Sequence, residues 1–198
     1  MLNCMIVGVG GQGTVLAARL IGSAALRNGF DVRGSETIGM AQRGGTVISH
    51  VRIDKSSIHS PLIPPGKADV IIAFEPGEAI RALPFLKKDG VLIASDKLID
   101  SVAGIPGGGN YEAAPVLNYL KANVKRLYLM QTNLFFSQCE PRSLNVALIG
   151  AALESGVLPF QISDIETVLS ERLKPQYLEK NMQALAFGQK FAQSMKAE

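Results

Sequence analysis

The sequence has few of the residues from which metal and redox centres are built. Its 198 residues include two cysteines, two histidines and no tryptophan. Iron–sulfur clusters are usually held by four cysteine thiolates, so Cys4 and Cys139 cannot ligate one without another chain. No closely spaced set of Cys and His predicts a zinc site. We therefore expect this chain to bind no metal and no cluster by itself, and its sparse cysteines are typical of a reduced, cytoplasmic protein.

Charged residues are also scarce. They make up 19% of the chain against 47% hydrophobic residues, which excludes a disordered protein and leaves apolar surface for a partner to cover. The net charge of +3 is scattered, and no basic block with interleaved aromatics predicts nucleic-acid binding. The apolar runs are short and broken by glycine, so we expect no membrane-spanning helix. Residues 1–9 resemble a strand rather than a secretory signal.

Strand and helix patterns alternate along the chain. This order is typical of a three-layer α/β/α, Rossmann-like domain with a mostly parallel sheet. We expect residues 1–198 to form one such domain, with a helical C-terminal part at 143–198. A hairpin-like stretch at 57–59 should pair back on the preceding strand and make the sheet mixed. The expected strands are 4–9, 30–34, 46–53, 68–74, 91–94 and 126–130, and the expected helices are 14–28, 76–86, 113–123, 143–154, a segment from 163 and a last one from 175.

Local signals set several of these boundaries. Gly29 is placed to end the first helix in the left-handed conformation. Ser163 and Glu166 have capping-box spacing, and Pro175 suits the first turn of the last helix. We expect an irregular segment at 35–45, a turn at 88–90 and a glycine-rich loop at 104–110.

A glycine-rich segment follows the first expected strand. Gly8, Gly10 and Gly13 satisfy the G-x-G-x-x-G pattern between a strand and a helix. Glycine permits positive φ and lets backbone N–H groups approach an anion at a helix N-terminus. Gln12 adds an amide suited to orienting a phosphate or a partner's carbonyl. Gly10, Gly11, Gln12 and Gly13 are therefore candidate binding residues, although the same glycines also suit a tight turn that binds nothing.

Other chemistry finds little support in the sequence. A dinucleotide-binding enzyme needs an acid at the end of its second strand, but Asp31 begins the expected strand and Glu36 lies in the polar loop. No G-K-[ST] motif predicts a nucleotide triphosphatase. His50 has no carboxylate or nucleophile spacing that indicates catalysis, and Cys139 has no resolving partner. We predict no catalytic residue on this chain.

A second glycine segment carries an arginine. Arg43 offers a planar, fork-shaped donor for a carboxylate or phosphate. Gly44 and Gly45 remove side-chain bulk beside it, which allows a ligand to approach the backbone. The alternative is a structural arginine bonded to loop carbonyls. Arg43, Gly44 and Gly45 join the candidate binding residues.

Together these segments resemble the gamma-type domain of the 2-oxoacid:ferredoxin oxidoreductases. The resemblance covers most of the chain, because an Asn145-to-Gly150 stretch and an ending from Asn181 to Gly188 also match the family's pattern, the last with a slight departure. The segment 40–45, followed by Ser-His-Val-Arg at 49–52, is most similar to the small (beta) subunits of the branch that acts on indolepyruvate.

The resemblance implies a function that depends on another chain. A large partner subunit would carry thiamine diphosphate, Mg²⁺ and iron–sulfur clusters, and would oxidise an aryl 2-oxoacid with coenzyme A and ferredoxin. Residues 10–13 and 43–45 would then lie near a coenzyme A phosphate or at the subunit seam. Expressed alone, the chain should be inactive and should self-associate, most simply as a homodimer.

Two other classes stay open from the sequence. One is a stand-alone Rossmann-type oxidoreductase that binds a dinucleotide. The other is a purely scaffolding subunit, in which the glycine segments serve only folding and docking.

Overall fold

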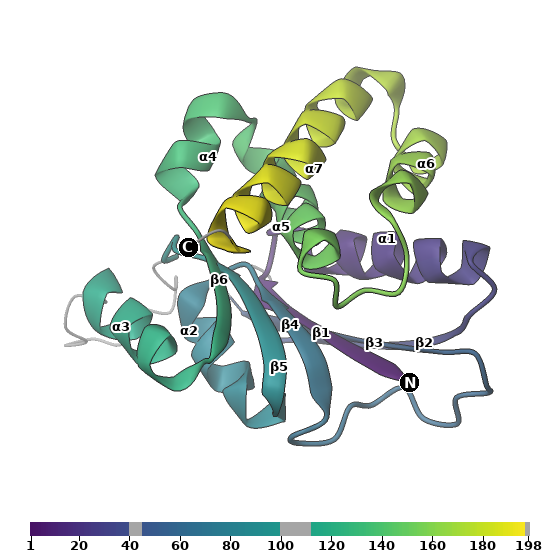
Figure 1. The fold of residues 1–198 in the computed structure, drawn as a ribbon, viewed down its shortest axis with the longest axis horizontal. Helices are drawn as coiled ribbons and strands as arrows, with labels where there is room; N and C mark the ends of the chain where they lie inside the picture. The colour runs from purple at the N-terminus through teal and green to yellow at the C-terminus, as the bar shows by residue number, and fades with distance from the viewer. Residues whose placement is uncertain (40–44, 100–111, 197–198) are drawn as a thin grey trace.

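A computed structural model describes residues 1–39, 45–99 and 112–196. Its strands form one sheet in the order β2-β3-β1-β4-β5-β6, with helices on both faces (Figure 1). This confirms the predicted α/β/α architecture. The elements are β1 (Leu2–Val9), α1 (Thr14–Arg27), β2 (Asp31–Ile38), β3 (Thr46–Asp54), β4 (Ala68–Ala73), α2 (Pro76–Ala82), β5 (Leu86–Ser95), α3 (Ala113–Asn123), β6 (Arg126–Met130), α4 (Thr132–Gln138), α5 (Leu144–Glu154), α6 (Ile162–Arg172) and α7 (Pro175–Lys196), with short 3-10 turns at Leu83–Phe85 and Pro141–Ser143.

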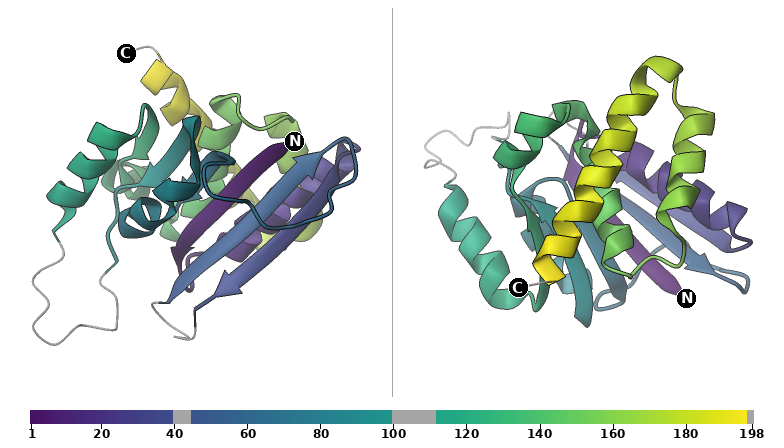
Figure 2. Two further views of the ribbon diagram at one scale, coloured as in Figure 1. Left: turned by 90° about the horizontal axis from the view of Figure 1, so that it is seen from below. Right: turned by 45° about the horizontal axis from the view of Figure 1, so that its top comes forward.

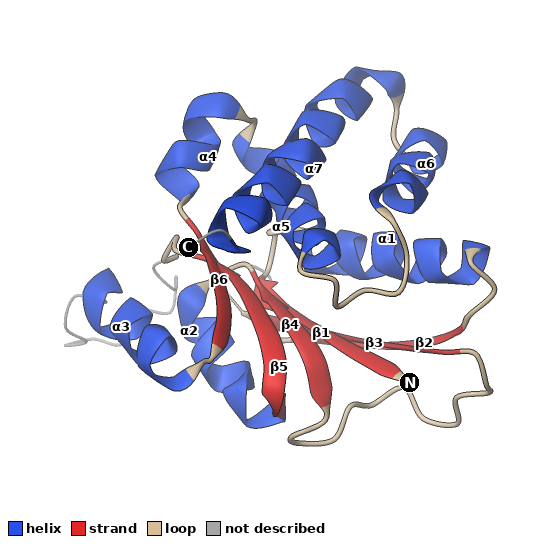
Figure 3. Cartoon of the chain, viewed as in Figure 1, coloured by secondary structure: helices blue, strands red, loops and turns tan. Residues whose placement is uncertain are grey.

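The sheet is mixed. Strands β1, β4, β5 and β6 run parallel, whereas β3 is antiparallel to both of its neighbours, β1 and β2. The central strands are buried on both faces, which explains their nearly continuous apolar sequences. Strand β2 lies at one edge of the sheet (Figure 3). Most of its side chains are exposed.

The helices divide between the two faces of the sheet. Helices α1, α5 and α7 pack on one face through an extensive apolar cluster, and α6 packs outside them against α1 and α7. Helices α2 and α3 cover the other face through a smaller apolar cluster (Figure 2). The predicted helical C-terminal part is therefore a covering layer on one face of the sheet. None of the helices in the described ranges combines the length and the apolar character needed to cross a bilayer.

Two glycines let α5 and α7 pack backbone to backbone. A Cβ at Gly188 would lie 1.8 Å from the Ala147 carbonyl oxygen, and one at Gly150 would lie 2.2 Å from that of Leu185. Neither separation is possible between real atoms, so only glycine fits these sites. This close approach explains why glycine ends both C-terminal sequence patterns.

The prediction for residues 30–45 was partly wrong. Strand β2 extends to Ile38, so residues 35–38 are not irregular. They pair with β3 over their whole length, from Ser35 opposite His50 to Ile38 opposite Val47. A strand at the edge of a sheet needs no buried face. The sequence of β2 therefore lacks the apolar pattern by which a strand is recognised.

The predicted hairpin at 57–59 was also wrong. The chain leaves β3 and crosses beside the sheet, where Ile58 and Ile63 are buried. The Asp31 carboxylate accepts a hydrogen bond from the Ile58 N–H at 2.8 Å and fixes this crossing. The sheet is mixed instead because β3 runs antiparallel to both β1 and β2.

Three further boundaries differ from the predictions. Residues 88–90 lie inside β5, whose pairing with β4 shifts register between Ala68 and Val70, so the expected turn is an irregularity within the strand. Helix α4 was not predicted, because its seven residues are too few to show a helical period.

The capping box of α6 is formed by Gln161 and Asp164, two residues before the predicted pair. The predicted loop at 104–110 lies outside the described residues.

Candidate functional site at the glycine turn

The glycine turn, residues 10–13, links β1 to α1 at the carboxyl edge of the parallel strands. Gly11 and Gly13 have φ values of +95° and +84°, which confirms the expected positive φ. The first backbone N–H to bond back within α1 is that of Ala17, which donates to the Gly13 carbonyl at 3.0 Å. The N–H groups before it, at the N-terminus of α1, have no intrahelical acceptor. The turn therefore presents a row of donors at the positive end of a helix.

Gln12 holds the turn against the neighbouring strand. Its Oε1 accepts a hydrogen bond from the Val9 N–H at 2.6 Å, and its Nε2 donates to the Phe74 carbonyl at 3.0 Å. Ser95 Oγ donates to the same carbonyl at 2.7 Å. A Cβ at Gly8 would lie 2.7 Å from Gln12 Oε1, so the first glycine of the motif makes room for this amide. The Gln12 side chain thus links the ends of β1 and β4.

A pocket of about 420 Å³ opens beside the turn. The N-termini of two helices, α1 and α5, border it, so two helix dipoles favour negative charge there. Its walls combine glycine backbone, apolar and aromatic side chains, and two basic side chains. The lining residues are Gly11, Gln12, Gly13, Leu16, Phe74, Lys97, Ile99, Phe136, Pro141, Arg142, Leu144 and Asn145.

Asn145 is the buried polar side chain of this pocket. Its side chain is 4% exposed, and its Oδ1 accepts a hydrogen bond from the Val146 N–H at 2.9 Å. Its Nδ2 would lie 2.7 Å from a Cβ at Gly13, which places the amide directly against the turn. Within the described ranges this Nδ2 has no hydrogen-bond acceptor. The fully buried side-chain atoms without a partner among the described residues are Ser49 Oγ and Glu75 Oε1, so Asn145 Nδ2 is not sealed from the pocket and can donate to a ligand or to water there.

Two exposed basic side chains, Lys97 and Arg142, also line the pocket. Lys97 follows β5, and its Nζ lies 5.0 Å from the centroid of the Phe136 ring. Arg142 belongs to the 3-10 turn before α5 and is exposed. The combination of backbone donors, a buried amide, two cations and an aromatic ring suits a phosphate that is attached to an apolar or aromatic group.

The structure places only part of the predicted site. Gly10 and Gly45 are brought together, because the Gly10 N–H donates to the Gly45 carbonyl at 3.0 Å. The two glycine segments therefore meet, as their joint assignment to one site requires. Arg43 and Gly44 lie outside the described residues.

Sequence reasoning missed the three other polar or charged residues of the pocket. Lys97 lies two positions beyond β5, at the strand edge where ligands bind in open α/β sheets, and this position was a usable signal. Asn145 was noted only as part of a family pattern. Arg142 joins the pocket through the turn before α5, which no local pattern indicates.

The strand order disfavours a dinucleotide site of the Rossmann type. Strand β3 lies between β1 and β2, since Ser49 faces both Ile6 of β1 and Glu36 of β2. An acid on β2 is therefore one strand too far from the glycine turn to bind the ribose of a nucleotide held there. Asp31 is further away still, at the amino end of β2, where it bonds Ile58.

The other titratable candidates have structural surroundings. His50 is buried, its Nδ1 accepts a hydrogen bond from the Ile63 N–H at 3.2 Å, and burial lowers its pKa. Burial raises the pKa of Cys4 to about 12 and also raises that of Cys139, so neither thiol is activated. Burial likewise raises the pKa of Glu75, which caps α2 by accepting from the Glu78 N–H at 2.8 Å. No cluster of three or more His, Cys, Asp or Glu side chains occurs among the residues described.

Comparisons of the sequence with known proteins find relatives that match over nearly the full chain. The chain is 37% identical to the indolepyruvate oxidoreductase subunit IorB of Thermococcus kodakarensis, over 98% of this chain and 96% of that protein. It is 35% identical to the subunit of the same name from Pyrococcus horikoshii, over 98% and 96% of the two chains. It is 27% identical to the pyruvate/ketoisovalerate oxidoreductases common subunit gamma of Pyrococcus abyssi, over 93% of each chain.

Solved structures share the same fold. The gamma subunit of a keto/oxoacid ferredoxin oxidoreductase from Geobacter sulfurreducens matches with a TM-score of 0.68 at 20% identity, over 98% of this chain and 99% of that one. The 2-oxoglutarate:ferredoxin oxidoreductase of Magnetococcus marinus, solved with 2-oxoglutarate, coenzyme A and succinyl-CoA bound, matches with a TM-score of 0.72 at 18% identity, over 98% of this chain and 31% of that longer one. The family model of pyruvate ferredoxin/flavodoxin oxidoreductase matches residues 3–191, and the chain belongs to this family.

Proposed function

We propose that this chain is the small subunit of a thiamine-dependent 2-oxoacid:ferredoxin oxidoreductase that acts on indolepyruvate. The observation that carries the proposal is its full-length similarity to the IorB subunits, at 37% identity, against 27% for a gamma subunit of the pyruvate and ketoisovalerate enzymes. The inserted order of strands, with β3 between β1 and β2, supports this function over a stand-alone dinucleotide-binding oxidoreductase.

The proposed reaction takes place mainly on another chain. A large partner subunit binds thiamine diphosphate with Mg²⁺ and the iron–sulfur clusters, which supply the carbanion chemistry and the electron path. The aryl 2-oxoacid, coenzyme A and oxidised ferredoxin give an aryl-acyl-CoA, carbon dioxide and reduced ferredoxin. The small subunit supplies binding and positioning groups, and an enzyme coupled to ferredoxin fits a cytoplasmic location.

The glycine-turn pocket is the proposed contact with coenzyme A. A phosphate group fits the unpartnered Asn145 Nδ2, the N–H groups of Gly11, Gly13 and Thr14 and the ammonium of Lys97, whereas the Gln12 N–H is used within the turn by the Val9 carbonyl. Phe136 suits an apolar or aromatic neighbour. Residues 43–45 are proposed to complete this site, because Gly45 is bonded to Gly10.

A purely scaffolding role is the second candidate. The observation that favours it is Gln12, whose amide was expected to orient a ligand but bonds Val9 and Phe74 within the fold. On this account the turn serves only to join β1, β4 and α1. The two accounts differ in whether the cations and Asn145 act on a ligand.

The experiment is a purification of the native complex followed by kinetics. The chain should co-purify with a large subunit that contains thiamine diphosphate and iron–sulfur clusters. In that complex, Asn145→Ala and Lys97→Ala should raise the KM for coenzyme A and leave the KM for indolepyruvate unchanged. A complex in which both variants assemble and keep the wild-type KM for coenzyme A would support the scaffold instead. Purification without any large oxidoreductase subunit would contradict the proposed function.

A further inference from the structure

A second hollow lies further along α1. This groove, of about 450 Å³, runs between α1 and the edge strand β2 and is called here the α1–β2 groove. Small residues form part of its walls. Helix α1 and β2 come close together at Gly22, where a Cβ added to the glycine would lie 3.5 Å from Val32 Cγ1. Its lining comprises Ala18, Arg19, Gly22, Ser23, Leu26, Val32, Gly34, Ser35, Glu36, His50, Val51 and Arg172.

The groove exists because the helical layer ends before the sheet does. Helix α1 packs on β1, β3 and part of β2, and no described helix lies beyond it toward the edge (Figure 1). Along β2, Val32, Gly34, Glu36 and Ile38 point to the α1 side, since alternate residues share a face. This face of β2 thus has space for one more element beside α1.

One exposed apolar side chain, Leu26, lines the groove, and another, Ile38, lies two residues beyond its last lining residue on β2. Leu26 is 59% exposed on the α1 side. Ile38 is 64% exposed at the end of β2, on the same face of the sheet as Val32. Large exposed aliphatic side chains beside an apolar hollow are typical of a surface that a partner covers.

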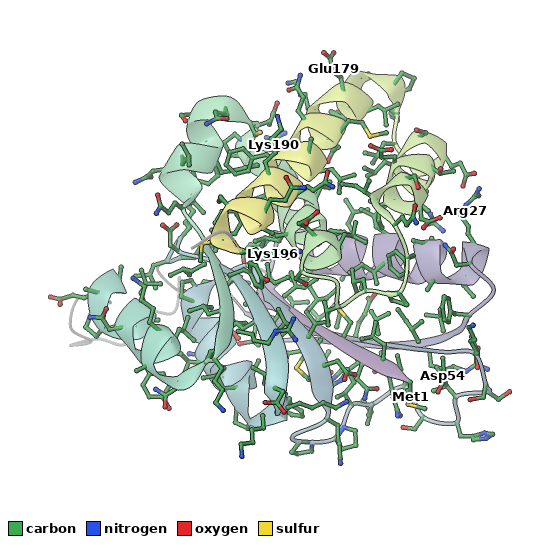
Figure 4. The ribbon with its side chains drawn as sticks, in the orientation of Figure 1. Met1, Arg27, Asp54, Glu179, Lys190 and Lys196 are labelled. Atoms are coloured by element: carbon green, nitrogen blue, oxygen red, sulfur yellow. The ribbon has the colours of Figure 1, made fainter. Side chains whose placement is uncertain are left out.

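The charges of the groove are unbalanced. Arg19 and Arg172 both line it, and neither forms an ion pair with any described residue. A neighbouring arginine does form an ion pair: the guanidinium of Arg27 on α1, labelled in Figure 4, lies 2.6 Å from the Glu171 carboxylate of α6. Two arginines face a single acid of the groove, Glu36, so its rim is positive.

We propose that the α1–β2 groove docks an amphipathic helix with an acidic rim that belongs to the large subunit of the assembled enzyme. This inference rests on the proposed function, which supplies the large subunit. An apolar face would cover Leu26, Val32 and Gly34, and carboxylates at the rim would pair with Arg19 and Arg172. The charge also disfavours two copies of this groove facing each other, because their arginines would meet.

The test measures binding of the chain to the large subunit isolated from the native complex. Arg19→Glu with Arg172→Glu should weaken binding about tenfold or more, with the loss shrinking at high salt, as for charges at an interface rim. Lys125→Glu with Arg126→Glu is the matched control, because it reverses the same number of charges at the other sheet edge, on exposed residues that have no ion pair in the described part of the chain. It should bind like the wild type. Arg19→Lys with Arg172→Lys should retain most of the affinity.

The apolar part of the groove has its own pair of variants. Leu26→Ser should weaken binding, whereas Leu134→Ser should not, since Leu134 is 49% exposed on α4, away from the groove. Both positions are exposed, so the melting temperature should change little in either variant.

The outcomes distinguish the two proposals. If the wild type binds the large subunit and the double glutamate variant binds equally well, the groove assignment is wrong while the proposed function stands. If the double variant instead breaks a dimer of the isolated wild-type chain and leaves binding to the large subunit intact, the occupant is a second copy and the inference is overturned. If the wild type does not bind the large subunit at all, both proposals are wrong.

Discussion

Gly11 and Gly13 share one turn and one backbone conformation but differ in their surroundings. Both have positive φ, yet nothing lies within 4 Å of a Cβ at Gly11, whereas a Cβ at Gly13 would lie 2.7 Å from Asn145 Nδ2. A side chain at either position has the backbone cost of the left-handed conformation, and only at Gly13 is there also a clash. The pair therefore separates backbone strain from steric contact.

Alanine at the two positions should give different losses of stability. Gly11→Ala should lower the free energy of unfolding by about 1–2 kcal/mol, the cost of the left-handed conformation. Gly13→Ala should lose at least about 1 kcal/mol more through overpacking against Asn145. Gly13→Ala combined with Asn145→Ala should recover this second loss only. Urea denaturation of the four proteins measures these differences, and equal losses for the two single variants would contradict the assignment of Asn145 to the turn.

Arg43 tests the ligand interpretation of the second glycine segment. If Arg43 binds a phosphate or a carboxylate, Arg43→Ala should cost the assembled enzyme roughly 1.5–3 kcal/mol of binding to that group, the range for a charge-assisted hydrogen bond. Arg43→Lys keeps the charge but loses the planar fork, so it should recover only part of the loss. The dependence of 2-oxoacid oxidation on coenzyme A measures this. Wild-type constants and wild-type assembly in Arg43→Ala would show a plain loop residue.

Residues of the site differ in how well the sequence predicts them. The glycine turn was predictable, because strand, glycines and helix follow one another within 13 residues. Lys97, Arg142 and Asn145 come from three distant segments, and only the fold brings them to one pocket. The sequence indicated Gln12 as a residue of the turn but not what its side chain does. Its amide donates to the Phe74 carbonyl, which is 62 residues away in the chain.

The contact of α5 with α7 depends on glycine in a way that is specific to this pair of helices. Gly188→Ala would drive a Cβ to within 1.8 Å of the Ala147 carbonyl oxygen, so the helices must separate. We expect a loss of about 3 kcal/mol or more in the free energy of unfolding, at or above the upper end of overpacking costs.

A helical glycine elsewhere is the control for this prediction. A Cβ at Gly22 of α1 would meet only Val32 Cγ1, at 3.5 Å, an ordinary contact. Gly22→Ala should therefore raise stability by about 0.5–1 kcal/mol, because alanine favours helix more than glycine does. Thermal unfolding of both variants is the measurement. A Gly188→Ala protein as stable as Gly22→Ala would refute the close packing of α5 and α7.

Elements were predictable where burial imposes a pattern. The strands β1, β4 and β6 and the helices α1, α3 and α7 were predicted closely, because each has an apolar period or a clear start signal. Strand β2 was cut short because an edge strand has no buried face to give it a period. The antiparallel partner of β3 was misplaced because pairing depends on distant residues, which no local signal in 54–59 reports.

At the scale of the whole molecule, two cysteines are too few to hold an iron–sulfur cluster. Its described residues contain no candidate metal cluster, and its cysteines are Cys4 and Cys139. The isolated chain should therefore show no visible iron–sulfur absorbance and should not oxidise any 2-oxoacid. Absorbance spectroscopy and a dye-reduction assay on the purified chain check this. Cluster absorbance or 2-oxoacid oxidation by the pure chain would contradict the assignment of the redox chemistry to a partner.

The most direct measurement is reconstitution of the purified chain with the large subunit that accompanies it. Electron transfer to ferredoxin should require both subunits and coenzyme A, and kcat/KM should be higher for indolepyruvate than for pyruvate. This is the result that the proposed function predicts. Full activity of the large subunit without this chain, or a preference for pyruvate over indolepyruvate in the reconstituted enzyme, would contradict it.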